Sequence, residues 1–69
     1  MTMSVNRRVQ EIRALLPHTM LRDREALSRR LSRIKMLEEQ KGDPGKLSEM
    51  LDAAQRQALA SVEERRYRR

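Results

Sequence analysis

Side chains that carry out catalysis or bind metals are scarce in this sequence. It has 69 residues, no Cys and a single histidine, His18, which follows a proline. A metal site needs several ligands and a nucleophile needs a base beside it, so neither is predicted. Residues 42–46 (Gly-Asp-Pro-Gly-Lys) resemble a phosphate-binding loop, but the glycines are too close together, and Leu47 stands where that loop needs Ser or Thr. We therefore predict no catalytic, cofactor-binding or metal-binding residue in this chain.

Arginine is the residue type that could bind a ligand here. The chain carries 16 Lys and Arg against 10 Asp and Glu, a net charge of +6. Arg22, Arg29 and Arg33 recur at spacings of seven and four, which places them on one helix face. Guanidinium groups pair with phosphate oxygens, so this face could follow a nucleic-acid backbone. The candidate nucleic-acid-binding residues are Arg22, Arg29, Arg30, Arg33 and Lys35. The same charges could instead only keep a helix face soluble, and Glu25 could partly neutralise Arg29.

The end of the chain is a second basic segment. Residues 65–69 (Arg-Arg-Tyr-Arg-Arg) combine arginines with Tyr67, the only aromatic residue in the sequence. They could form an arm that binds nucleic acid, or a frayed helix end in which residues 67–69 begin a basic linker. No aromatic residue is interleaved with the arginines of residues 22–35, so stacking of bases is not expected in that segment.

The spacing of apolar residues predicts three helices, over residues 4–16, 20–41 and 44–66. Three amphipathic helices with short connections can hide their apolar faces only against one another. The predicted fold is all-α, a small three-helix bundle with helices two and three as an antiparallel hairpin, in one domain over residues 4–66. The residues expected to be buried are Leu27, Leu31, Ile34, Leu51, Ala54 and Val62.

The connections between these helices also carry signals. Pro17 ends the first helix because proline removes a backbone donor, and Thr19 is expected to cap the second. Gly42 is expected to be the left-handed residue after the second helix. Asp43 and Pro44 suit the N-cap and the first position of the third.

Membrane insertion is not predicted. The longest apolar run, residues 14–16, is far shorter than a membrane span, and residues 1–16 lack the apolar core of a signal peptide. We expect a cytoplasmic chain without a membrane partner.

Two segments of the predicted second helix resemble a known family. Residues 20–24 (Met-Leu-Arg-Asp-Arg) and 27–31 (Leu-Ser-Arg-Arg-Leu) are similar to a segment near the N-terminus of bacterial HrpA-type DEAH-box ATP-dependent RNA helicases. An Ala- and Gln-rich helix and a basic stretch follow, in the order seen in that family, whereas the first predicted helix is the least family-like part. The resemblance implies an accessory domain of a longer enzyme. The parent would use ATP and magnesium to remodel RNA or RNA–protein complexes, and its catalytic residues would lie in motor domains beyond residue 69.

Other functions compete with this reading. In a protein-docking module, Leu15, Leu37 or Leu59 would pack against the helicase core in cis or against a second copy, and the arginines would only be solvated. A helix-turn-helix DNA reader is disfavoured because a hairpin gives antiparallel helices rather than a crossed pair, so no preference for DNA is expected. A membrane-surface helix is disfavoured by the absence of Trp and Phe.

Overall fold

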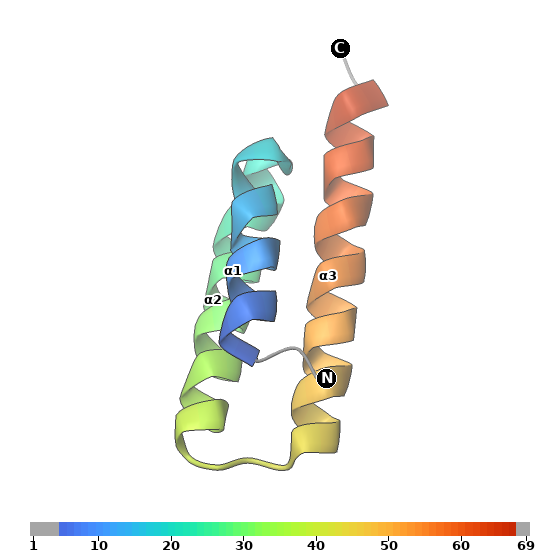
Figure 1. Ribbon diagram of the computed structural model, residues 1–69. Helices are drawn as coiled ribbons and strands as arrows, with labels where there is room; N and C mark the ends of the chain where they lie inside the picture. Colours follow the sequence, from blue (N-terminus) through green and yellow to red (C-terminus); the bar gives the residue numbers. More distant parts are fainter. Residues whose placement is uncertain (1–4, 68–69) are drawn as a thin grey trace.

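The computed structural model describes residues 5–67, which form three α-helices and no strand (Figure 1). α1 spans Val5–Leu15 and continues into a short 3-10 turn, η1, at Leu16–His18. α2 spans Leu21–Glu39 and α3 spans Pro44–Tyr67. Successive helices run in opposite directions, so α2 and α3 form an antiparallel hairpin, and α1 lies against both. The predicted all-α three-helix bundle is confirmed.

The core is a single apolar cluster to which all three helices contribute. It consists of Val9, Ile12, Leu27, Leu31, Ile34, Leu47, Leu51, Ala54 and Ala58. Five of the six residues predicted to be buried are in this set. The prediction for the sixth, Val62, is wrong, because this residue is only half-buried. The buried stripe of α3 runs through residues 47, 51, 54, 58 and 61, alternating steps of four and three. Ser61 is therefore the buried residue at this end of α3, with 4% of its surface exposed.

The connection between α1 and α2 turns tightly after Pro17. Thr19 is fully buried, and its hydroxyl donates a hydrogen bond of 2.6 Å to the carbonyl oxygen of Leu16. The prediction that Thr19 caps α2 is wrong, because Met20 is the N-cap and no side chain caps α2 from that position. The threonine hydroxyl instead closes the η1 turn behind it.

For the connection between α2 and α3, one prediction is confirmed and another is wrong. Asp43 accepts a hydrogen bond from the Gly45 amide at 3.3 Å and α3 begins at Pro44, as predicted. Gly42 is not the left-handed residue, because Lys41 has the positive φ of 58°. The amides of Lys41 and Gly42 donate to the carbonyls of Glu38 and Leu37, both at 2.9 Å, which is the Schellman pattern with Lys41 as its left-handed residue. Gly42 is needed for space instead, because a Cβ there would lie 3.0 Å from the Leu37 carbonyl oxygen.

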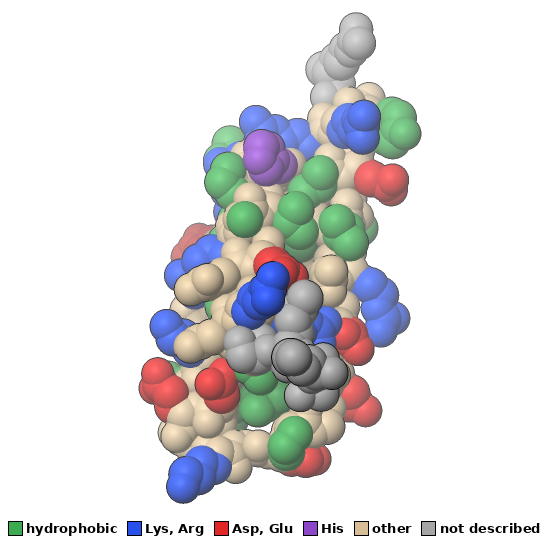
Figure 2. All heavy atoms as spheres, in the orientation of Figure 1, with side chains coloured by type: hydrophobic (Ala, Val, Ile, Leu, Met, Phe, Trp, Pro, Cys, Tyr) green, Lys and Arg blue, Asp and Glu red, His purple; other side chains and the backbone are tan. Residues whose placement is uncertain are grey.

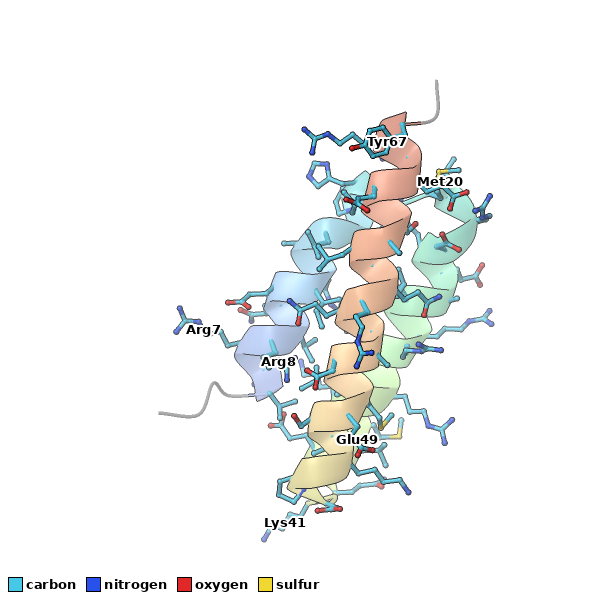
Figure 3. All side chains as sticks on the ribbon, turned by 90° about the vertical axis from the view of Figure 1, so that its right-hand side faces the viewer. Arg7, Arg8, Met20, Lys41, Glu49 and Tyr67 are labelled. Atoms are coloured by element: carbon cyan, nitrogen blue, oxygen red, sulfur yellow. The ribbon has the colours of Figure 1, made fainter. Side chains whose placement is uncertain are left out.

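α1 is tied to α3 by a polar contact as well as by the core. Arg8 extends from α1 toward α3, where it bonds to Asp52 at 2.6 Å and to Gln55 at 3.2 Å (Figure 3). No helix within residues 5–67 is both long and apolar enough to cross a membrane.

Candidate nucleic-acid interface

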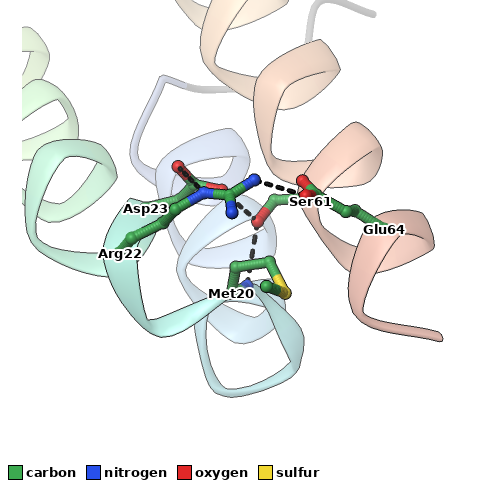
Figure 4. A network of polar contacts seen from close by, with 5 residues as sticks. All are labelled: Met20, Arg22, Asp23, Ser61 and Glu64. Atoms are coloured by element: carbon green, nitrogen blue, oxygen red, sulfur yellow. Dashed lines mark hydrogen bonds and ion pairs between the residues drawn. The ribbon is translucent and has the colours of Figure 1, made fainter. Parts of the chain in front are cut away.

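The five candidate RNA-binding residues lie on α2 but have different surroundings. Arg22 forms an ion pair with Glu64 of α3, and its Nε lies 3.8 Å from a carboxylate oxygen of Asp23 (Figure 4). The hydrogen bond to Glu64 and the charge of that carboxylate raise the pKa of Arg22 above its ordinary value. Arg22 is therefore already paired within the fold.

A polar network beside Arg22 fixes the start of α2 against α3 (Figure 4). The Ser61 hydroxyl donates to a carboxylate oxygen of Asp23 at 2.7 Å and accepts the Met20 amide at 2.9 Å. The hydroxyl thus supplies a partner for one of the amides that every helix N-terminus leaves unpaired. The polar groups at this end of α2 therefore hold α2 against α3.

Two further arginines bind the turn between α1 and α2. Arg24 donates to the carbonyl oxygens of Pro17 and Thr19 at 2.9 and 3.2 Å, and Arg65 of α3 donates to the same two oxygens. Arg65 thus has a structural partner. α3 continues to Tyr67, one residue past the predicted helix end, and the arginines at positions 68 and 69 lie outside the described residues.

Arg29 is paired weakly. It bonds to Glu25 at 2.6 Å, one helical turn away, but the two side chains are 78% and 76% exposed. Such an exposed pair stabilises a helix by about 0.3–0.5 kcal/mol. A phosphate oxygen could replace the Glu25 carboxylate at little cost.

Arg30, Arg33 and Lys35 have no acidic partner in the part of the chain that the structure describes. Arg30 donates to the neutral side-chain oxygen of Gln57 on α3 at 2.8 Å, which leaves its positive charge in place. Arg33 and Lys35 are exposed, and their side chains form no hydrogen bond or ion pair with any residue between 5 and 67. Besides Arg24, whose guanidinium binds the carbonyl oxygens of the α1–α2 turn, these three residues carry the cationic charge of α2 that has no acidic partner among residues 5–67.

A groove between α2 and α3 brings part of this charge together. We call it the α2–α3 groove; it is lined by Arg29, Arg30, Arg33, Leu37, Lys46, Met50 and Ala53. Four of these residues are cationic, none is acidic, and the other three are apolar. Of the predicted set, the groove contains Arg29, Arg30 and Arg33, whereas Arg22 and Lys35 lie outside it.

Lys46 was not among the predicted site residues. It precedes Met50 and Ala53 by four and seven positions on α3, so all three share the helix face beside the buried stripe. The spacing within α3 predicts that Lys46 shares a face with Met50 and Ala53, and the packing of α3 against α2 brings this face beside the arginines of α2.

The leucines of the docking alternative are mostly engaged in the bundle. Leu15 and Leu37 are partly buried and pack against the core, whereas Leu59 is 47% exposed. Figure 2 shows hydrophobic side chains gathered near His18 on the face formed by α1 and α3, with basic and acidic side chains interspersed farther down. Between residues 5 and 67 no three His, Cys, Asp or Glu side chains lie close enough to hold a metal ion.

No family model, curated protein or solved structure matches this chain.

Proposed function

We propose that this chain is an N-terminal accessory domain of a DEAH-box ATP-dependent RNA helicase, and that the basic side of α2 contacts RNA or an RNA–protein particle. The observation that supports RNA contact is the α2–α3 groove, in which cations of two helices gather without an acidic residue. The helicase context is supported by the resemblance of residues 20–31 to HrpA-type enzymes. ATP hydrolysis, with magnesium, would belong to the motor domains of the parent, which this domain would accompany in cis.

The contacts expected are with phosphates. Arg30 and Arg33 present guanidinium groups that pair with no carboxylate of residues 5–67, and such groups can bind phosphate oxygens through two parallel hydrogen bonds. Phosphate contacts fix position without reading the base sequence. The domain is therefore expected to bind RNA weakly, with little sequence preference and with an affinity that falls as salt rises.

The test is a titration of labelled RNA with the purified 69-residue chain at several salt concentrations. A variant carrying Arg30→Gln and Arg33→Gln removes two uncompensated charges of the groove. Each phosphate contact on a single strand contributes roughly 0.7 to the slope of log affinity against log salt, so the slope should decrease by about 1.4. The matched control carries Arg13→Gln and Arg56→Gln, which remove two exposed arginines outside the groove.

The control should bind RNA with nearly the slope of the parent chain. Equal losses in the two double variants would mean that RNA responds only to net charge, and the absence of RNA binding at low salt would refute RNA contact. The helicase context has a separate test. The reading frame beyond residue 69 should encode a phosphate loop and a DEAH motif, and their absence would refute it.

A further inference from the structure

The α2–α3 groove differs from the outer face of α2 in having walls on two helices. Arg29, Arg30 and Arg33 line it from α2, and Lys46 lines it from α3. The hydrogen bond from Arg30 to Gln57 joins the two helices beside it. A ligand in the groove therefore meets positive charge on both sides, whereas a ligand lying across α2 alone would not reach Lys46.

The two walls of the groove belong to helices that pack directly against each other, which limits how far apart the walls lie. Axes of packed helices are about 8–10 Å apart, and a single helix with its side chains is about 10–12 Å across. A nucleic-acid duplex is much wider, since its major groove alone admits a whole helix. A duplex could touch the cationic rims, but only a single strand could lie between them.

The floor of the groove is apolar. Leu37 and Met50 are half-buried and pack against the core, and Ala53 is exposed beside them. A duplex presents mainly phosphates and sugars to such a surface, whereas a single strand exposes the faces of its bases. The polarisable thioether of Met50 can contact a base face.

We infer that the α2–α3 groove selects single-stranded over double-stranded RNA, with phosphates on Arg30, Arg33 and Lys46 and bases over Met50 and Ala53. The inference rests on the proposed function and adds to it the form of the RNA and the contribution of α3. No aromatic residue lines the groove, so the selection comes from its width and its apolar floor.

The experiment compares a labelled single-stranded RNA with the duplex that it forms with its complement, using the 69-residue chain at low salt. The single strand should bind more tightly although it carries half as many phosphates. Lys46→Ala should weaken single-strand binding about threefold and reduce the salt slope by about 0.7, one phosphate contact. Ala53→Glu should weaken it about tenfold, because it places a carboxylate among the phosphates and covers the floor.

Ala14→Glu is the matched control for the second variant. It makes the same change at an exposed alanine on α1, which does not line the groove, and it should leave single-strand binding nearly unchanged. Circular dichroism would check that all variants remain helical. A duplex that binds as tightly as the single strand, or an Ala53→Glu effect equal to that of Ala14→Glu, would overturn the inference while RNA contact stands. Failure of both RNA forms to bind would overturn the proposed function itself.

Discussion

Ser61 connects α3 to the start of α2 through a single hydroxyl group. The hydroxyl donates to Asp23 and accepts the Met20 amide in a position that is 4% exposed. One buried side chain therefore serves both as donor and as acceptor between two helices.

Ser61→Ala is expected to destabilise the domain by about 1–3 kcal/mol, the cost of leaving a buried donor without its acceptor. The loss should appear as a lower midpoint in urea denaturation. Ser48→Ala, at an exposed position of the same helix, is the control and should change stability by about half a kcal/mol or less. Equal midpoints for the two variants would show that the network contributes nothing.

The arginines of this chain show why residue roles were hard to predict. Arg22 and Arg33 share one face of α2 in the sequence pattern, yet Arg22 meets Glu64, whereas Arg33 meets no partner among the described residues. The difference depends on which residue of α3 lies opposite, and helical spacing within α2 does not contain that information. Spacing identifies candidates for a site, and the packing of the neighbouring helix selects among them.

Among the signals at the helix connections, those at the start of α3 gave correct predictions, whereas those at Thr19 and Gly42 did not. Asp43 and Pro44 act within one helical turn, so the start of α3 could be predicted. Val62 was predicted to be buried, but Ser61 is the buried residue at this end of α3. Thr19 was predicted to cap α2, but the Ser61 hydroxyl binds the Met20 amide at the start of that helix. Gly42 was expected for its conformation, but it is needed for its small size.

Two glycines of the hairpin allow a direct test of that last point. Gly42→Ala is expected to destabilise the domain by about 1 kcal/mol, because the new Cβ would press on the Leu37 carbonyl that accepts the Gly42 amide. At Gly45 a Cβ would meet only ordinary contacts at 3.8 Å and no positive φ is involved. Gly45→Ala should therefore stabilise by about 0.4–1 kcal/mol through the unfolded chain. Thermal unfolding of the two variants measures both effects, and a stabilising Gly42→Ala would contradict the packing argument.

The whole molecule depends on one small core. Leu31 is fully buried among residues of this core, and the domain has no disulfide to support it. Leu31→Ala is expected to cost about 2–5 kcal/mol, a large part of the stability of so small a domain. The melting temperature should fall sharply, and much of the helical signal could be lost at room temperature. Leu21→Ala removes a leucine that is 77% exposed and should leave the melting temperature almost unchanged.

The contacts around the α1–α2 turn join a segment that is synthesised early to side chains that are synthesised late. Ser61 reaches Met20 across 41 positions, Glu64 reaches Arg22 across 42 and Arg65 reaches Pro17 across 48. During synthesis the turn leaves the ribosome first, and the three side chains that complete it are made near the end of α3. Until they emerge, the first half of the chain lacks the side chains that bind the α1–α2 turn. The last turns of α3 therefore complete a structure that begins more than forty residues earlier.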